Sequence, residues 1–372
     1  MAEPIRVLQI IGLVCGGGVE AVILNYYKHI DRDKVQFDFV VHKDSPVDIT
    51  ETVEAMGGRV YKVTPYYKNP IAFTVEIYKI IRKNQYRIVH SNMNTLSVFP
   101  LFAAWVAGVP VRILHNHSTS APGETKRNIA KAILKPFAKL FANRKWACSR
   151  YAAEWMYGKE PVERGEVTII SNAINLAKYA FSEEKRKEVR NEWGVTDEFV
   201  VGHVGRFVFT KNHEFLIDIF AKALPKNPHM ILILVGDGPL RQAVEEKVKK
   251  AGIADKVKFL GICQNVQDLY NGMDLFVLPS HYEGLPVVGV EAQANGLPIL
   301  VSNRVTKEME ITSAVEYKKL SDGADSWADR TVKDPWTRKA DLEADKKLRA
   351  AGYDITEAAK ALEQRYIDEM TA

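Results

Sequence analysis

The sequence is poor in the residues that mark several classes of protein. It has 3 cysteines in 372 residues, and the wide spacing of Cys15, Cys148 and Cys263 excludes a disulfide framework and a paired-cysteine zinc site. Its 23 glycines and 16 prolines are not in excess, which excludes collagen-like and low-complexity chains. With 47% hydrophobic and 26% charged residues the chain is a globular protein, and its length favours two domains.

Long hydrophobic runs are also missing. The uncharged stretch 90–111 is interrupted by asparagine, proline and glycine, which a membrane-spanning helix rarely tolerates. The N-terminal sequence MAEPIRVLQIIG lacks the basic start of a signal peptide and passes directly into a strand pattern. We therefore expect a cytoplasmic protein, with any membrane association being peripheral and on the inner face of the cell membrane.

Positive charge is concentrated in the first half of the chain. Residues 1–180 hold 24 Lys and Arg against 15 Asp and Glu, whereas the rest holds 27 against 31. The segment 124–142 is predicted to be an amphipathic helix with Lys131, Lys135 and Lys139 four residues apart on one face. This face is expected either to meet anionic headgroups on the acceptor side or to be a solvated side of a packed helix. Because no nucleic-acid-binding motif accompanies it, nucleic acid is not expected as a partner.

Apolar, β-branched runs alternate with amphipathic stretches along the whole chain. Continuous apolar strands, each followed by a helix, indicate parallel strands covered on both faces. The pattern restarts after the polar segment 171–198, with new strands expected at 199–204, 230–235, 257–260, 274–278 and 298–301. The predicted fold class is α/β, with two Rossmann-like, doubly wound domains facing a central cleft. Their expected bounds are 1–172 and 173–355, and a C-terminal helix at 356–372 is able to cross back to the first domain.

Two loops carry groups suited to phosphate. The glycine-rich loop 12–18 follows the first strand and opens a helix, so the backbone at Gly17 and Gly18 can approach an anion; a plain turn is the alternative. Arg206 leaves the end of a strand and Lys211 starts the next helix, so both cations can converge on one polyanion. Two solvated loop charges are the alternative there.

A third loop, Glu283-Gly284-Leu285-Pro286, follows the apolar strand DLFVL. Pro286 suits the first position of a helix, which leaves the N–H groups at Gly284 and Leu285 for an anion. Glu283 and Glu291 can accept hydrogen bonds from hydroxyls of a sugar and a ribose. Each glutamate taken alone could equally be a surface charge or a helix cap.

Together these residues resemble the retaining glycosyltransferases of family 4, which have the GT-B fold. The resemblance is carried by Arg206 and Lys211, by the turn that begins at Gly236, and by the E-x7-E spacing from Glu283 to Glu291. It covers nearly the whole chain. The run 301–312 is similar to that of enzymes assembling bacterial capsular polysaccharide or exopolysaccharide.

The resemblance implies transfer of a hexose from a nucleoside diphosphate donor to a saccharide or a polyprenyl-diphosphate-linked acceptor. A UDP-linked donor is expected, with no metal and no other cofactor. Arg206 and Lys211 would stabilise the leaving diphosphate, Glu283 with the Gly284 and Leu285 amides would orient the donor sugar, and Glu291 would hold the ribose. The base would lie near Ile262.

The acceptor side is expected in the first domain, where the family carries a histidine near the reacting carbon. His115 and His117 both qualify, and His117 is favoured as the catalytic residue because His115 can still lie within the strand. Two other functions remain open: a nucleotide-sugar epimerase or hydrolase on the same fold, and a non-catalytic subunit that binds sugar nucleotides.

Overall fold

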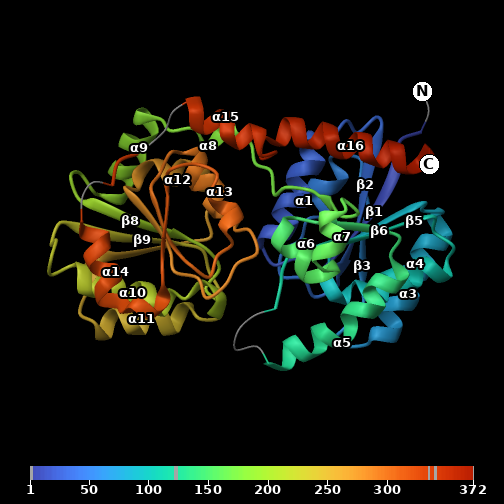
Figure 1. Cartoon of the computed structure of the whole chain (residues 1–372), viewed down its shortest axis with the longest axis horizontal. Coiled ribbons are helices and arrows are strands. Elements are labelled where there is room, and N and C mark those ends of the chain that lie inside the picture. The colour runs from blue at the N-terminus through green and yellow to red at the C-terminus, as the bar shows by residue number, and fades with distance from the viewer. Residues whose placement is uncertain (1–2, 121–124, 334–335, 339–341, 372) are drawn as a thin grey trace. The chain divides into compact units, whose positions relative to one another are not determined.

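The computed structural model describes residues 3–120, 125–333, 336–338 and 342–371. The chain divides into two compact units, Met1–Ala173 with Asp354–Ala372, and Ile174–Tyr353. Each unit contains one parallel sheet with helices on its faces (Figure 1). The predicted fold class, two doubly wound α/β domains, is confirmed. Glu124, with which the predicted basic helix begins, lies outside the described residues.

The first unit has a seven-stranded sheet in the order β3-β2-β1-β4-β5-β6-β7. Because the order reverses between β1 and β4, the loops after these strands diverge and leave room for a ligand. The strands are β1 Ile5–Gly12, β2 Val35–His42, β3 Val60–Val63, β4 Ile88–Ser91, β5 Val111–Asn116, β6 Arg144–Ala147 and β7 Thr168–Ile169. The helices are α1 Gly18–His29, α2 Thr50–Glu54, α3 Pro70–Asn84, η1 Asn94–Ser97, α4 Val98–Val106, α5 Thr125–Phe141, α6 Arg150–Tyr157 and α7 Lys159–Glu163.

The second unit has a six-stranded sheet in the order β10-β9-β8-β11-β12-β13, which reverses between β8 and β11. Its strands are β8 Phe199–Val204, β9 Met230–Val235, β10 Val257–Gly261, β11 Leu275–Leu278, β12 Ile299–Ser302 and β13 Val315–Lys318. Its helices are α8 Leu176–Tyr179, α9 Glu183–Trp193, η2 Phe209–Lys211, α10 His213–Ala223, α11 Arg241–Lys250, η3 Ala254–Lys256, α12 Val266–Gly272, α13 Val287–Ala294, η4 Lys307–Met309, η5 Leu320–Asp322, α14 Gly323–Val332 and α15 Leu342–Ala350.

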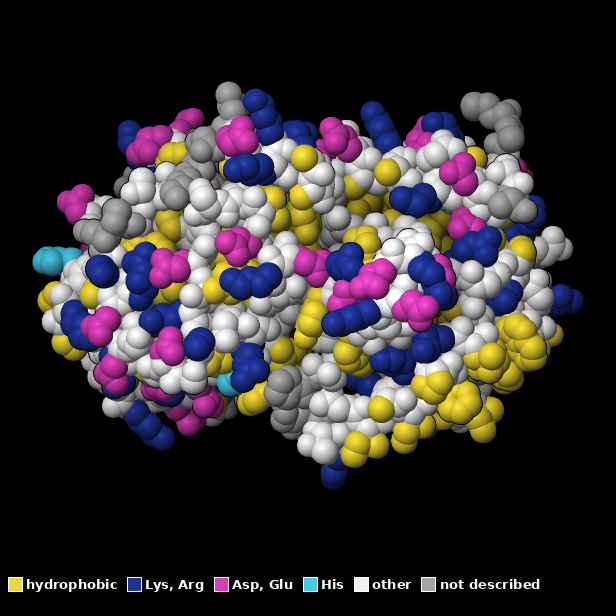
Figure 2. All heavy atoms as spheres, viewed as in Figure 1, with side chains coloured by type: hydrophobic (Ala, Val, Ile, Leu, Met, Phe, Trp, Pro, Cys, Tyr) yellow, Lys and Arg dark blue, Asp and Glu magenta, His cyan; other side chains and the backbone are white. Residues whose placement is uncertain are grey.

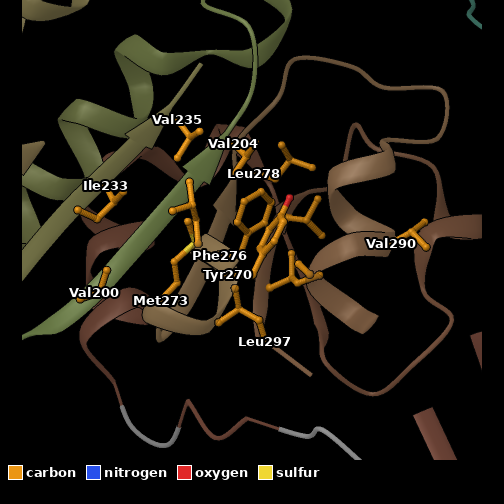
Figure 3. Packing of buried hydrophobic residues seen from close by; sticks show 14 of the residues in the cluster. Val200, Val204, Ile233, Val235, Tyr270, Met273, Phe276, Leu278, Val290 and Leu297 are labelled. Carbon is orange, nitrogen blue, oxygen red and sulfur yellow. The ribbon is translucent and has the colours of Figure 1, made fainter. Parts of the chain in front are cut away.

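The core of the second unit explains why these strands carry unbroken apolar runs. Val200, Ile233 and Phe276 lie on three neighbouring strands and belong to one hydrophobic cluster with Tyr270 of α12 (Figure 3). The ring of Tyr270 lies 5.8 Å from that of Phe276, centroid to centroid. β11 is buried along its whole length, as expected of a central parallel strand. β13 was not predicted: its sequence VEYK alternates in polarity, and all four residues are half-buried at the edge of the sheet.

The helix α16, Ile355–Thr371, belongs to the first unit although it follows the second in sequence (Figure 1). Its Tyr366 is fully buried. The centroid of the Tyr366 ring lies 5.7 Å from that of Phe37 and 5.6 Å from that of Trp146. Glu363 accepts hydrogen bonds from the Asp31 N–H at 3.0 Å and from Lys34 Nζ at 2.9 Å. The core of the first unit is therefore built from two segments of the chain.

Candidate functional site

In the second unit, the loops after β8 and β9 meet backbone to backbone. The Gly205 N–H donates to the Val235 carbonyl at 2.9 Å, and the Gly236 N–H donates to the Gly261 carbonyl at 2.7 Å. Gly236 has φ of 126°, and a Cβ added there would lie 2.2 Å from the Gly205 carbonyl oxygen. No residue with a side chain fits this approach, so Gly236 sets the spacing of the two loops.

Lys211 and Glu283 form an ion pair at the carboxyl-end edge of this sheet. Lys211 Nζ lies 2.6 Å from Glu283 Oε1, and the two side chains are only 15% and 16% exposed. The Ser280 hydroxyl donates to the same carboxylate oxygen at 2.9 Å. Because Lys211 follows β8 and Glu283 follows β11, the pair lies at the point where the strand order reverses, the usual ligand position in such sheets.

Further contacts join the loop after β8 to the loop after β11 on either side of that ion pair. The His281 N–H donates to the Thr210 carbonyl at 2.8 Å, and Asn212 Nδ2 donates to the Pro279 carbonyl at 3.0 Å. The rings of Phe209 and His281 stack with centroids 4.4 Å apart. Arg206 lies at the end of β8 with an exposed side chain. The sheet thus brings the predicted cations to one edge and holds Lys211 firmly.

The start of α13 differs from the prediction. The helix begins at Val287, and Pro286 is its N-cap residue rather than its first helical residue. Gly289 donates to the Pro286 carbonyl at 3.0 Å, so the leading N–H groups are those of Val287 and Val288. Gly284 and Leu285 precede the cap. The N–H groups of the first helical turn are therefore those of Val287 and Val288 rather than those of Gly284 and Leu285, because the extended conformation of Pro286 delays the first turn.

Glu291 lies within α13, and both of its carboxylate oxygens have phenol partners. The Tyr179 hydroxyl donates to Oε1 at 2.8 Å, and the Tyr270 hydroxyl donates to Oε2 at 2.7 Å. Burial raises the pKa of Glu291 above its ordinary value, although the two hydrogen bonds oppose this shift. Neither tyrosine was predicted as a site residue, since nothing in their local sequence separates them from core tyrosines.

Ile262, expected beside the base, follows β10 and is 78% exposed. It comes directly after Gly261, whose φ of 71° turns the chain at the end of the strand. An exposed apolar side chain at the carboxyl end of a strand of this sheet is suited to pack on a flat ring.

In the glycine loop of the first unit, two backbone N–H groups already bind a carboxylate of the chain itself, that of Glu20. Glu20 Oε1 accepts hydrogen bonds from the N–H groups of Cys15 at 2.9 Å and of Gly17 at 2.6 Å. Glu20 is buried, and its bond to the Gly17 N–H is the glutamate half of a capping box at the start of α1. The Gly17 amide, predicted to contact the donor, is therefore satisfied within the chain. Gly18 begins the helix and has open space where a Cβ would lie.

His115 lies in β5 and His117 directly follows the strand, as the sequence analysis assumed. His117 is half-buried, its Nε2 lies 3.0 Å from Asn92 Oδ1, and its N–H donates to Asn94 Oδ1 at 2.7 Å. Burial lowers the pKa of His117 to about 4, so the ring is neutral at neutral pH. A neutral histidine at this edge can exchange hydrogen bonds with hydroxyls but adds no positive charge.

The basic helix α5 presents a different face from the one predicted. Lys131 donates to the Thr119 carbonyl at 2.8 Å, and Lys135 donates to the Trp155 carbonyl and lies 4.7 Å from the centre of its ring. The prediction of an outward lysine face is therefore wrong for these two residues, although Lys139 is exposed. Long lysine side chains can reach back to carbonyls of their own domain.

The outer surface of α4 and α5 is apolar instead. Figure 2 shows hydrophobic side chains gathered over these helices at the lower right. Leu140 is 70% exposed and Ile133 is 59% exposed. The other exposed members of this apolar face are Phe102, Trp105, Val106, Ile129 and Phe137. A contiguous exposed apolar face of this kind marks an interaction surface.

The described residues contain neither a metal-binding cluster nor a membrane-spanning helix. Across residues 3–120, 125–333, 336–338 and 342–371, no group of three or more His, Cys, Asp or Glu is placed to hold a metal ion. In the same part of the chain, no helix combines the length and the apolar character needed to cross a bilayer.

Comparison with known proteins identifies relatives over the whole chain. Residues 16–178 match the model described as Glycosyltransferase Family 4, and residues 185–323 match Glycosyl transferases group 1. EpsF of Bacillus subtilis (strain 168), which carries the name of a glycosyltransferase, is 32% identical over 364 residues, covering 96% of this chain and 95% of EpsF.

Two further matches have lower identity. The UDP-Gal:alpha-D-GlcNAc-diphosphoundecaprenol alpha-1,3-galactosyltransferase of Escherichia coli is 25% identical, covering 77% of this chain and 76% of that protein. The crystal structure of Anabaena Alr3699/HepE in complex with UDP and glucose superposes with a TM-score of 0.78 at 20% identity, covering 97% of this chain and 99% of that one. This last likeness shows the fold.

Proposed function

The chain belongs to glycosyltransferase family 4 and has the GT-B fold, and from this premise we propose that it transfers a hexose from a nucleoside diphosphate donor with retention at the anomeric carbon. We expect UDP as the leaving group, and a saccharide or a polyprenyl-diphosphate-linked saccharide of bacterial surface polysaccharide as the acceptor. The UDP-bound and lipid-linked substrates in the names of the HepE structure and the E. coli relative support these choices.

The ion pair between Lys211 and Glu283 carries the proposal. Its ammonium and carboxylate are fixed 2.6 Å apart at the edge where a ligand of this sheet binds. An incoming diphosphate can take the lysine as partner, and the carboxylate is then free to accept from hydroxyls of the donor sugar. Arg206, on the same edge, adds a second cation.

In the proposed reaction, the bond between C1 of the sugar and the diphosphate oxygen breaks. A new bond from C1 to the acceptor oxygen forms on the same face, and the acceptor proton passes to the departing phosphate. Charge that develops on the diphosphate meets cations already in position, which is the most effective form of electrostatic stabilisation. No step requires a metal ion, and Glu291 would orient the ribose.

A donor screen tests this function. Thermal shifts with UDP-, GDP-, ADP- and dTDP-hexoses identify the donor, because a ligand that binds only the folded chain raises Tm according to its affinity. Transfer is then followed with a saccharide diphosphate lipid acceptor, and proton NMR gives the anomeric configuration of the product. Retention with the cognate donor supports the proposal, whereas inversion, or interconversion of free donor without an acceptor, contradicts it.

We also propose that the apolar face of α4 and α5 docks on an anionic bilayer. Charge complementarity favours this occupant over a second protein. Residues 125–153 contain no Asp or Glu, and Lys126, Arg127 and Lys139 are exposed on α5, the helix that carries most of this face. Basic residues near an anionic membrane each add about 1 kcal/mol of attraction, while the apolar face enters the headgroup region. A lipid-linked acceptor would be met at that surface.

Vesicle binding tests the docking surface. The chain should sediment with phosphatidylcholine vesicles that contain phosphatidylglycerol, and binding should weaken in high salt. The double variant Ile133→Ser, Leu140→Ser should lose most of this binding. The control Ile71→Ser, at another exposed apolar position, on α3, should keep it. Equal binding by both variants, or a self-association that the double variant alone abolishes, would overturn the docking proposal.

A further inference from the structure

Six polar side chains of the first unit form one continuous chain of hydrogen bonds. It connects the carboxyl ends of β4 and β5 with β1 and with the C-terminal helix α16. Its members, in order along the chain of bonds, are His117, Asn92, Gln9, Tyr366, His90 and His115. All except His117 are buried. Its two ends meet, because the rings of His115 and His117 stack with centroids 4.0 Å apart.

The direction of these bonds is set at Asn92. Its Nδ2 lies 3.0 Å from Gln9 Oε1 and 3.5 Å from the backbone carbonyl of His90. A carbonyl oxygen can only accept, so the amide nitrogen of Asn92 faces it and the amide oxygen faces His117. With the amide reversed, two oxygens would face each other. His117 Nε2, 3.0 Å from that amide oxygen, must therefore carry the ring proton.

The remaining bonds follow the same direction. Gln9 Nε2 donates to the Tyr366 hydroxyl at 3.1 Å, and this hydroxyl has one proton, which it donates to His90 Nδ1 at 2.6 Å. His90 then donates from Nε2 to His115 Nδ1 at 3.0 Å. The chain ends at His115 Nε2, a buried atom with no hydrogen-bond partner in the part of the protein that the structure describes. The orientation of each member is thus fixed by its neighbours.

We propose that Asn92, Gln9 and Tyr366 are positioning residues that lock His117 in the tautomer with its proton on Nε2, so that Nδ1 accepts a hydrogen bond from a sugar hydroxyl. The identity of that hydroxyl rests on the proposed transfer function, whereas the tautomer does not. Stacking on His115 fixes the plane of the ring as well.

This arrangement suits a group that handles neutral hydroxyls. Within the described residues, His117 Nδ1 has no hydrogen-bond partner, so its lone pair is available. Burial keeps the ring neutral, since the pKa of His117 falls to about 4. A histidine free to change tautomer would present an N–H at Nδ1 for part of the time, and it would then donate to the hydroxyl oxygen instead of accepting the hydroxyl proton. The bound hydroxyl can belong to the donor sugar or to the acceptor.

The tautomer can be observed directly by NMR. In the full-length protein labelled with 15N-histidine, long-range proton–nitrogen spectra distinguish a protonated ring nitrogen from an unprotonated one, and the His117→Gln variant assigns the signals. We expect Nε2 protonated and Nδ1 unprotonated in the unliganded protein. A signal for His117 protonated on Nδ1 would overturn the proposal, with or without any enzymatic activity.

Two variants break the chain of bonds at a distance from His117. Tyr366→Phe keeps the buried ring and removes its hydroxyl, and Asn92→Leu removes the acceptor itself. Both should shift the His117 nitrogen signals toward a mixture of tautomers. The matched control is Tyr86→Phe, which removes another buried hydroxyl, one that donates to Asp38 at 2.6 Å. Signals of His117 that stay the same in Tyr366→Phe and Asn92→Leu would contradict a positioning role.

Kinetics then show which hydroxyl is bound. If it belongs to the donor sugar, Tyr366→Phe should lower kcat/KM about tenfold for donor hydrolysis without acceptor and for transfer alike, the effect of one weakened hydrogen bond. If it belongs to the acceptor, only transfer should fall. Unchanged rates for both, in a variant whose tautomer has changed, would overturn the role of Nδ1. A confirmed tautomer in a protein that transfers no sugar would refute the proposed function alone.

Discussion

Lys211 is the residue on which the proposed reaction depends most directly. We expect Lys211→Met to lower kcat about 100-fold, because one preorganised charge opposite the leaving group is lost. The rate of nucleoside diphosphate release measures this. The control is Lys222→Met, on the same unit. It removes an exposed ion pair in which Lys222 Nζ lies 2.7 Å from Asp325 Oδ1, and it should leave kcat unchanged. Equal rates in both variants, with circular dichroism showing intact folding, would refute the assignment.

The raised pKa of Glu291 predicts that the free energy of unfolding depends on pH. Burial holds the pKa of Glu291 above its ordinary value of 4.5, so the folded chain retains a proton that the unfolded chain gives up. The resulting stabilisation is complete below the unfolded pKa and declines as the pH rises through the folded pKa. Glu291→Gln cannot titrate. The free energy of unfolding of the wild type minus that of Glu291→Gln should therefore fall from pH 4 to pH 7 in urea titrations. A flat difference would contradict this.

Individual site residues were predictable where the backbone alone determines their position. Arg206, Lys211 and Glu283 each lie in the connection after the carboxyl end of a parallel strand, so a strand assignment already places them at one edge. The partners of a side chain are not local in this way. The contacts of Tyr179 and Tyr270 with Glu291 depend on how separate segments pack, and a single sequence contains no signal for that. The contact of Glu20 with the Gly17 amide is local, but the glycine loop was interpreted as open to a ligand.

Among the loops and helices, the contact between the β8 and β9 loops gives the sharpest prediction. Gly236→Ala should lower the free energy of unfolding by about 3 kcal/mol, since its φ of 126° is strained for alanine and its Cβ would collide with the Gly205 carbonyl. Gly252→Ala is the matched control. It also has positive φ, 69°, but has nothing within 4 Å of its Cβ, so about 1 kcal/mol is expected. Similar losses of unfolding free energy in both variants would show that the loops shift to relieve the collision at residue 236, and would contradict this prediction.

Whole elements were predicted well where apolar runs are unbroken and less well elsewhere. β8 and β9 have the predicted bounds, because a strand buried on both faces is apolar at every position. β13 lies at an edge and lacks that signal. For α5 the lysines and the apolar residues were both recognised, but helical periodicity does not tell which side faces the protein. The orientation depends on the carbonyls of Thr119 and Trp155, which lie outside the helix, 12 and 20 residues from the lysines that bind them.

At the scale of the molecule, the first unit depends on α16. Tyr366→Ala should destabilise that unit by about 4 kcal/mol, as expected for an aromatic side chain removed from a closely packed core. Hydrogen exchange measures this: amides of β1 and β6 should exchange faster together with those of α16. Faster exchange in α16 alone would mean that the helix is peripheral. Tyr366→Phe, which keeps the packing, should cost only about 1 kcal/mol.

The return of α16 also determines when the first unit can be completed during synthesis. The ribosome has to make the entire second unit before Ile355 and the residues after it emerge. Until then, the nascent first unit lacks the aromatic side chain that fills the space beside Phe37 and Trp146, and its unpaired apolar surface is open to chaperones and to aggregation. A chain that terminated just after the second unit would therefore carry a complete second unit and an incomplete first unit.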